Sequence, residues 1–400
     1  MRRVALVLAA VALLLAGWLG WVVYLTAAND RACREAARGP RESGSAARSE
    51  ELRRVLERYS AKNGGVGLQA SVIFPDGKVW SGTSGCANNG KRCRLTLDHH
   101  LYVGSMTKLF TATLVMEQVQ KGTISLDDTL EGWVDLPYAK NVTVRMLLNH
   151  TSGIPNYTED AWFIARYFGI PSKQWSPDEM VGVIEDKPLE FEPGSRYEYS
   201  NSNYLPLGMI LQKETGKPYE VLLRDGVTKK VGLRDTFFMT YYPDDLAIAD
   251  GYDEAMLPFG RTNLTGFRTS FATRGFSGGG ILSDSEDVAR FTHSLFTGRI
   301  LSEPALAQME TFVKAPDEHY PEQKGYGLGV RNMMIGVEAL VGHTGIIGGR
   351  PTQRGEELHH SHPEQPLRYR ADAPLRRASG SRLARRGFSR GRPSQSPAKI

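Results

Sequence analysis

Cysteine is scarce in this 400-residue chain, which contains three. So few cysteines cannot hold together a fold of this length, which therefore needs a hydrophobic core. With 41% hydrophobic residues, the composition is that of a globular protein and not of a disordered or fibrous one. Cys86 and Cys93 flank a turn-forming sequence, which is consistent either with a disulfide in an oxidising compartment or with two free thiols.

Most of the chain also lacks an excess of charge of one sign. The formal net charge is +5, but residues 350–400 hold 12 Lys or Arg against 4 acidic residues, and the first 349 residues hold 37 against 40. A nucleic-acid-binding function would therefore rest on the last segment alone, and we expect no nucleic-acid partner.

A long uncharged, mostly apolar run opens the chain. Residues 4–28 number 25, more than the ~20 that cross a hydrocarbon core. A cleavable signal has a shorter apolar stretch, so the run favours a membrane anchor, although the small residues at 26–28 leave cleavage and secretion open. Arg2 and Arg3 place the N-terminus in the cytoplasm, so the rest of the chain is predicted to be extracytoplasmic.

The remaining sequence divides into a linker, a folded domain and a tail. Residues 29–48 have no apolar period, which predicts a linker, and folded sequence occupies residues 49–349. The first elements predicted in it are a helix over 49–62 capped by Ser49, a hairpin over 68–80 and a buried helix from Ser105. A mainly helical stretch follows over 127–270, with a capping box at Ser176 and a helix from Tyr204 to Gly216. Strands are predicted over 278–282, 326–330 and 336–340. Strands on both sides of a helical middle predict an α+β fold with a helical insertion.

A serine and a lysine three residues apart are the first candidates for catalysis. A serine hydroxyl is a poor nucleophile at neutral pH and needs a base within hydrogen-bond reach. Residues three apart share one face of a helix, so the Lys108 amine can lie beside the Ser105 hydroxyl, and burial would lower the pKa of that amine. The spacing alone is weak evidence, because Ser396 and Lys399 repeat it in the tail.

Two further sequence triplets support a catalytic role for Ser105 and Lys108. Residues 199–201 are the only Tyr-x-Asn among 16 tyrosines, and residues 343–345 are the only His-Thr-Gly or Lys-Thr-Gly. Their order and separation after Ser105 match the signature of penicillin-binding proteins and serine β-lactamases. The chain thus resembles the D-alanyl-D-alanine carboxypeptidase and class C β-lactamase family over residues 49–349. Further similar stretches are 103–108, 126–128, 143–153, 199–208 and 342–345.

The resemblance implies an α+β fold in which an antiparallel sheet is flanked by helices and carries a largely helical inserted region. It implies that Ser105 is the nucleophile, that Lys108 is its base and that Tyr199 shuttles a proton to the leaving group. The backbone N–H groups of Ser105 and Ile346 would form the oxyanion hole. No cofactor and no metal are implied.

The resemblance also implies how a substrate is bound. Asn201 would hold the acyl amide, and Thr344 with His343 would meet the substrate carboxylate. A histidine stands at 343 where β-lactamases usually carry lysine, and histidine is only partly charged near neutral pH. This difference favours a peptidase or an esterase over a β-lactamase.

Other polar residues are predicted to be structural. His150 lies in a stretch that matches a turn motif of the family. The glycines at 278–280 indicate backbone that approaches another segment closely. His359, His360 and His362 have no evident partner ligands, so we predict no metal site there.

The similarity ends at Gly349. Residues 350–400 form an Arg, Ser, Pro and His-rich tract without apolar period, which predicts a disordered basic tail in place of the last strands and helix of the family. We therefore expect a fold that is incomplete at its C-terminus, with the strand that leads into His343 at an unprotected edge.

The leading functional hypothesis is a D-alanyl-D-alanine carboxypeptidase-like serine hydrolase acting on peptidoglycan stem peptides. The alternatives are a β-lactamase, a small-ester hydrolase, or a membrane-tethered sensor that binds muropeptides or β-lactams without turnover.

Overall fold

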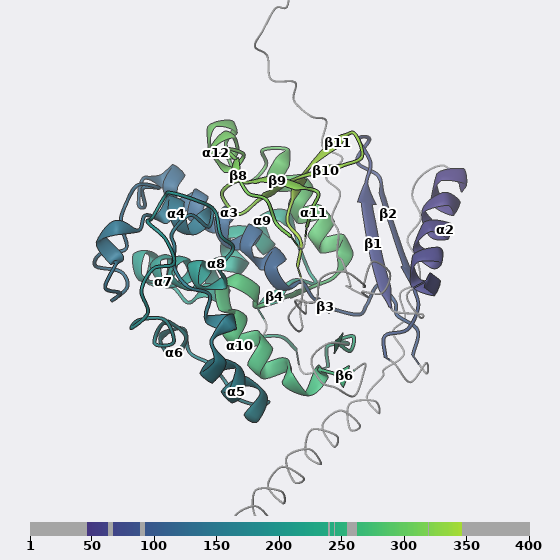
Figure 1. The fold of residues 1–400 in the computed structure, drawn as a ribbon. Helices are drawn as coiled ribbons and strands as arrows, with labels where there is room; N and C mark the ends of the chain where they lie inside the picture. The colour runs from purple at the N-terminus through teal and green to yellow at the C-terminus, as the bar shows by residue number, and fades with distance from the viewer. Residues whose placement is uncertain are drawn as a thin grey trace, which may run out of the picture.

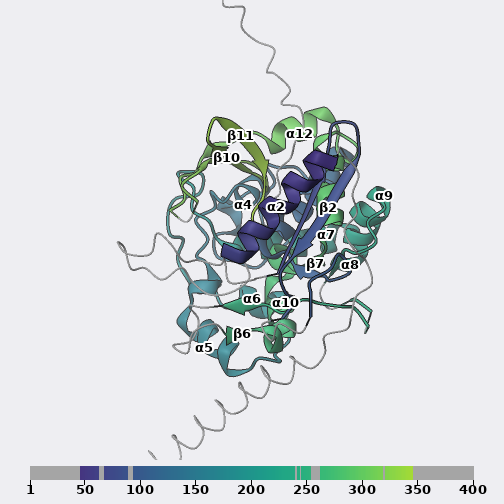
Figure 2. The same ribbon diagram turned by 90° about the vertical axis from the view of Figure 1, so that its right-hand side faces the viewer.

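A computed structural model of the protein describes residues 46–62, 67–88, 93–238, 241–243, 245–253, 262–318 and 320–345. They form helices packed on short antiparallel sheets (Figure 1, Figure 2), which confirms the predicted α+β fold. The predicted anchor, the linker up to residue 45 and the tail over residues 350–400 lie outside the described residues. Within the described ranges, no helix is long and apolar enough to cross a membrane.

All but one of the helices below lie between residues 107 and 309, and the longer strands lie towards the two ends of the fold. The helices are α2 (Ala46–Lys62), α3 (Thr107–Lys121), α4 (Val144–Leu148), α5 (Ala161–Gly169), α6 (Pro177–Val181), α7 (Tyr204–Thr215), α8 (Tyr219–Leu223), α9 (Lys229–Val231), α10 (Arg268–Gly279), α11 (Ser285–Phe296) and α12 (Glu303–Met309). The strands are β1 (Leu68–Ile73), β2 (Val79–Ser84), β3 (Leu101–Tyr102), β4 (Phe237–Phe238), β5 (Tyr252–Asp253), β6 (Thr262–Asn263), β7 (Ile281–Ser283), β8 (Val313–Lys314), β9 (Gln323–Tyr326), β10 (Arg331–Ile335) and β11 (Glu338–Gly342).

The predicted hairpin over 68–80 is confirmed as the antiparallel pair β1–β2, with Gly77 at φ 80 in its turn. Helix α2 covers β2 (Figure 2), and α11 packs on β1. Helix α2 begins at Ala46, so the prediction that Ser49 caps it is wrong; Ser49 is buried inside the helix.

The other end of the fold is the antiparallel sheet β11-β10-β9-β8. The strand predicted over 326–330 lies earlier, because β9 ends at Tyr326, and the strand β10 was not predicted. The strand predicted over 278–282 is also displaced: Gly278 and Gly279 end α10, and β7 begins at Ile281. In each case a glycine-rich turn carries apolar residues that also suit a strand.

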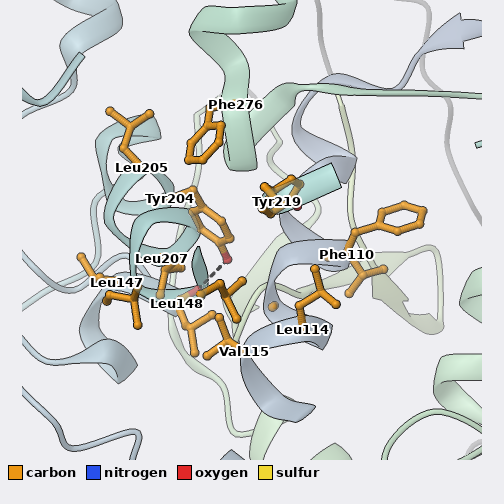
Figure 3. Close-up of a cluster of buried hydrophobic side chains, with 14 of the residues drawn as sticks. Phe110, Leu114, Val115, Leu147, Leu148, Tyr204, Leu205, Leu207, Tyr219 and Phe276 are labelled. Carbon is orange, nitrogen blue, oxygen red and sulfur yellow. Dashed lines mark hydrogen bonds between the residues drawn. The ribbon is translucent and has the colours of Figure 1, made fainter. Parts of the chain in front are cut away.

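Helix α3 runs through the middle of the molecule, and the prediction that it is buried is confirmed, since its residues from Thr107 to Gln118 are buried all around. Figure 3 shows its side chains packed among those of α4, α7, α8 and α10. The labelled core residues are Phe110, Leu114, Val115, Leu147, Leu148, Tyr204, Leu205, Leu207, Tyr219 and Phe276. This packing fixes the start of α3 relative to the helical region and the sheet.

The local helix signals are confirmed at two further places. Ser176 and Glu179 form the predicted capping box at the start of α6. Helix α7 begins at Tyr204 and ends at Gly216, which has φ 66. Neither alternative for Cys86 and Cys93 holds: Cys86 carries a free thiol and is not bonded to Cys93, whereas Cys93 is disulfide-bonded.

Candidate active site

Ser105 lies at the start of the central helix. It belongs to the 3-10 turn Gly104–Met106, which runs directly into α3, and it is partly exposed between two buried neighbours. Lys108, in the first turn of α3, is fully buried. Its Nζ lies 3.1 Å from Ser105 Oγ. The structure therefore brings the predicted nucleophile and the predicted base into hydrogen-bond contact.

Three oxygens surround the Lys108 amine. Besides Ser105 Oγ, they are Asn201 Oδ1 and Gly278 O, each 2.9 Å from Nζ. The last two can only accept hydrogen bonds, so a neutral amine would donate both N–H groups to them and direct its lone pair to the serine hydroxyl. Burial lowers the pKa of Lys108 well below its usual value, and the charges of Arg331 and Arg274 lower it further.

The carbonyl of Gly278 comes from a strained turn at the end of α10. Phe276 has φ 36 and ψ −131, a backbone conformation that costs free energy for a bulky residue. A Cβ on Gly278 would lie 3.2 Å from Tyr204 Cβ and 3.6 Å from Lys108 Nζ. The glycine thus lets the backbone come close enough to form a wall of the lysine pocket.

Asn201 is held with its amide in one orientation. Its Oδ1 accepts from Lys108, and its Nδ2 lies 3.4 Å from both Asn156 Oδ1 and Thr158 Oγ1. Its backbone N–H donates to Asn156 Oδ1 at 3.2 Å. The two contacts of Nδ2 are long, so this amide N–H can be given up to a substrate carbonyl at little cost.

Tyr199 brings a buried hydroxyl to the site, close to Ser105 and Arg331. Its ring centre lies 5.1 Å from Lys108 Nζ, and its hydroxyl is buried with no hydrogen-bond partner among the described residues. Burial raises the pKa of Tyr199, and the nearby Arg331 guanidinium opposes that shift. A buried hydroxyl without a partner costs free energy unless a ligand or water pairs with it.

Arg331 is a residue of this site that sequence analysis missed. It lies on β10, is 3% exposed, and stacks on the rings of Tyr199, Tyr320 and Tyr326 with its Cζ at 5.2, 4.5 and 5.7 Å from their centres. It also pairs with Asp317 Oδ2 at 3.1 Å. A signal was present in the sequence, since Arg331 is the only charged residue between residues 326 and 336.

His343 directs both ring nitrogens to protein atoms. Its Nε2 lies 2.7 Å from the Tyr326 hydroxyl, and its Nδ1 lies 2.5 Å from Thr344 O. Burial lowers the pKa of His343 well below its usual value, and the charges of Arg331 and Lys108 add to this shift. In this arrangement the histidine is neutral and has no N–H left for a substrate carboxylate.

The residues after His343 close the site over Ser105. A Cβ on Gly345 would lie 1.9 Å from Val103 O, so only glycine allows this segment to approach the serine turn so closely. The hydroxyl of Thr344 is buried with no hydrogen-bond partner in the described part of the chain. Ile346, the second predicted oxyanion donor, lies outside the described residues.

The arrangement of these motifs has a counterpart in a known family. The sequence profile described as Beta-lactamase matches residues 52–354, which is most of the chain. The chain belongs to the beta-lactamase family. Relatives that match this chain include penicillin-binding proteins and a D-alanyl-D-alanine-carboxypeptidase/endopeptidase.

Individual members of the beta-lactamase family are similar to this chain over part or most of it. Penicillin-binding protein 4 of Amycolatopsis lactamdurans is 32% identical over 178 residues, covering 42% of this chain and 43% of the relative. The D-alanyl-D-alanine-carboxypeptidase/endopeptidase AmpH of Escherichia coli is 27% identical over 200 residues, covering 47% and 50%. The chain thus spans half or less of the length of these two relatives.

One solved structure of a related protein matches a larger share of this chain than those two relatives do. D-amino acid amidase from Ochrobactrum anthropi SV3, complexed with D-phenylalanine, superposes with a TM-score of 0.67 and 31% identity over 74% of this chain and 84% of the amidase. Within the described residues, no group of three or more His, Cys, Asp or Glu side chains is placed to hold a metal ion.

Proposed function

We propose that the chain hydrolyses an amide bond next to a D-amino acid residue through an acyl-enzyme on Ser105. The leading substrate is the D-alanyl-D-alanine end of a peptidoglycan stem peptide. The observation that carries the proposal is the buried Lys108 amine 3.1 Å from the Ser105 hydroxyl. Similarity to AmpH and to D-amino acid amidase supports the choice of substrate class.

Lys108 is the base in the first step. Its neutral amine takes the proton of the Ser105 hydroxyl while Oγ bonds to the substrate carbonyl carbon, and the carbonyl oxygen becomes an oxyanion. The backbone N–H of Ser105 and, by the family resemblance, that of Ile346 stabilise this oxyanion. The depressed pKa of Lys108 supports this role, because the amine is available as a base at a lower pH than in water.

Tyr199 serves the leaving group. Because burial raises its pKa, Tyr199 keeps its proton near neutral pH, and its unpaired hydroxyl is suited to donate that proton to the leaving nitrogen. The proton that Lys108 took from Ser105 replaces the one donated. Water then attacks the acyl-enzyme in the reverse sequence of proton transfers and frees Ser105.

An amide without a C-terminal carboxylate is a second candidate substrate, and a specific observation favours it. The ring nitrogens of His343 are both occupied, so this residue offers no N–H to a carboxylate. The unpaired Thr344 hydroxyl remains as a neutral hydrogen-bonding group beside it. A D-amino acid amide needs no cation at this position.

A substrate panel on the full chain separates these functions. We expect turnover of a diacyl-D-alanyl-D-alanine peptide or of D-phenylalanine amide, and weaker turnover of nitrocefin and p-nitrophenyl acetate. A fluorescent penicillin or fluorophosphonate should label Ser105, and Ser105→Ala should abolish labelling. Label recovered on a different serine, or binding of all ligands without turnover, would contradict the proposal; the second result would favour a sensor.

We also propose that the domain acts outside the cytoplasm, tethered to the membrane. Support for this comes from the sequence: 25 uncharged residues follow Arg2 and Arg3. A substrate in the cell wall is consistent with that location.

A further inference from the structure

The segments that carry the Tyr-Ser-Asn and His-Thr-Gly triplets are joined by a row of hydrogen bonds through His150 and Tyr326. His150 follows α4, and Tyr326 is the last residue of β9; both are fully buried. His150 Nε2 lies 3.3 Å from the Tyr326 hydroxyl, which in turn lies 2.7 Å from His343 Nε2. At its other end, His150 Nδ1 receives the backbone N–H of Ser200 at 3.3 Å.

The direction of every proton in this row follows from its two ends. Ser200 N–H can only donate, and Asn203 Nδ2 donates to the same His150 Nδ1 at 2.9 Å because Asn203 Oδ1 accepts from Ser152. His150 Nδ1 therefore carries no proton, and the neutral ring has its proton on Nε2, which donates to the tyrosine oxygen of residue 326.

The same reasoning fixes the second histidine. Thr344 O can only accept, so the proton of neutral His343 lies on Nδ1, 2.5 Å from that carbonyl. His343 Nε2 is then an acceptor and takes the proton of the Tyr326 hydroxyl. Every donor meets an acceptor along the row, and one protonation state satisfies all of its members.

We propose that Tyr326 and His150 are positioning residues that hold His343 neutral in its Nδ1–H tautomer. As a result, the side of the site that receives the leaving group offers a substrate uncharged hydrogen-bonding groups. A protonated His343 would direct an N–H at a tyrosine oxygen that already receives one from His150, and the tyrosine proton would lose its acceptor. The segment at 343–345 therefore meets a substrate through the Thr344 hydroxyl and without a positive charge. The inference about substrate preference rests on the proposed function, whereas the inference about the tautomer of His343 is independent of it.

The surroundings of His343 act in the same direction. The charged or titratable groups that face it are Lys108 of α3, Arg331 of β10, Tyr326 of β9 and His150 after α4. The charges of Arg331 and Lys108 disfavour a further positive charge on His343. His150 has φ 58, a conformation that costs free energy and that the surrounding packing must enforce, and its ring packs against that of Tyr199, 4.3 Å away between centres.

The test uses the full-length wild type and a matched pair of variants. Tyr326→Phe removes one oxygen from the row and keeps the ring. Tyr197→Phe is the control, because Tyr197 packs in the same aromatic cluster, 5.6 Å from the Tyr326 ring, and its hydroxyl contacts Gln323 outside the row. Nitrogen-15 NMR of histidine-labelled protein, with His343 assigned through His343→Gln, reports its tautomer directly.

In the wild type we expect His343 to show a protonated Nδ1 and an unprotonated Nε2 from pH 5 to 8. In Tyr326→Phe we expect its titration to rise by roughly one pH unit or more, and KM for the diacyl-D-alanyl-D-alanine peptide to fall severalfold below pH 6. The KM for D-phenylalanine amide should not fall below pH 6 in this variant, because the amide has no carboxylate. Tyr197→Phe should behave as wild type in both measurements.

A wild-type His343 that carries its proton on Nε2, or that titrates within pH 5 to 8, would overturn the proposal even if Tyr326→Phe failed to fold. Equal behaviour of the two tyrosine variants would also overturn it. Failure of the proposed function has a different signature: the tautomer would be as expected while neither the peptide nor the amide is turned over and Ser105 takes no label.

Discussion

Lys108 has a protonation state that depends on burial more than on any partner. None of its three hydrogen-bonded oxygens belongs to a carboxylate, and the two charges that act on it, Arg331 and Arg274, are both positive. An ammonium in such a place is destabilised relative to water, so the neutral amine becomes accessible.

Lys108→Met should remove the base and keep the fold, because methionine fills similar apolar space. We expect the rate of fluorophosphonate labelling of Ser105 to fall by about 10² to 10⁴, the usual contribution of general base catalysis. Circular dichroism and thermal unfolding should confirm that the variant is folded. A rate within about tenfold of wild type, roughly 1.4 kcal/mol in the barrier, would mean that the base lies elsewhere.

The pH dependence of labelling should follow Lys108. Its folded-state pKa lies well below 10.5, so the amine loses its proton earlier as the pH rises than it would in the unfolded chain. The labelling rate should therefore rise with pH and level off well below pH 10.5. By linkage, the unfolded chain binds more protons below pH 10.5, so this residue destabilises the fold increasingly as the pH falls towards the folded pKa. A rate that still climbs above pH 10 would contradict the depressed pKa.

At the scale of elements, the site depends on close approaches that glycines permit. The segment after β11 reaches the turn before α3 only because residue 345 has no side chain. At the turn that ends α10 the approach is less tight: a Cβ on Gly278 would lie 3.2 Å from Tyr204 Cβ, and the carbonyl of Gly278 accepts from Lys108. Both contacts join segments that lie more than 150 residues apart in the chain: residue 345 meets Val103, and residue 278 meets Lys108.

Gly345→Ala should separate β11 from the serine turn. Its Cβ would meet a backbone carbonyl at 1.9 Å, and backbone cannot rotate away as a side chain can. We expect Ser105 labelling to fall at least tenfold, measured at equal folded concentration. Gly169→Ala is the control, since a Cβ there meets nothing within 4 Å, and it should leave labelling unchanged. Wild-type labelling of Gly345→Ala would show that this approach is not needed.

At the scale of the whole molecule, the site is built where the helical region meets the sheet. Lys108 and Ser105 come from the central helix, Tyr199 and Asn201 from the loop before α7, and His343 from the end of β11. A hydrogen bond from Gly329 N to Leu148 O, at 3.1 Å, also ties the β9–β10 connection to α4. Figure 1 shows α3 between these two regions.

The N-terminal segment makes a prediction for the whole chain. Because residues 4–28 are long enough to cross a bilayer, the full chain should sediment with membranes and resist extraction by high salt. Deletion of residues 1–28 should release the protein to the soluble fraction with unchanged labelling of Ser105. Full-length protein found in the soluble fraction at its full mass would contradict an anchor.

Local elements could be predicted because their signals lie within a few residues of each other. The hairpin at 68–80, the capping box at Ser176 and the end of α7 at Gly216 each depend on a turn or cap that the chain specifies locally. Strand β10 was missed and β7 was displaced, because short apolar runs beside glycines fit strands and helix ends equally well. Pairing with a distant strand decides between them.

Three motifs in their order along the chain were enough to indicate the family and to predict that Ser105 and Lys108 lie together, since residues three apart share one face of a helix. The effect of the charges on the site depends on tertiary packing. Arg331 faces Tyr199, and His343 meets Tyr326, because segments far apart in the chain pack together and exclude water. The protonation state of a buried group depends on those neighbours and on its burial, and neither can be read from the residues beside it in sequence.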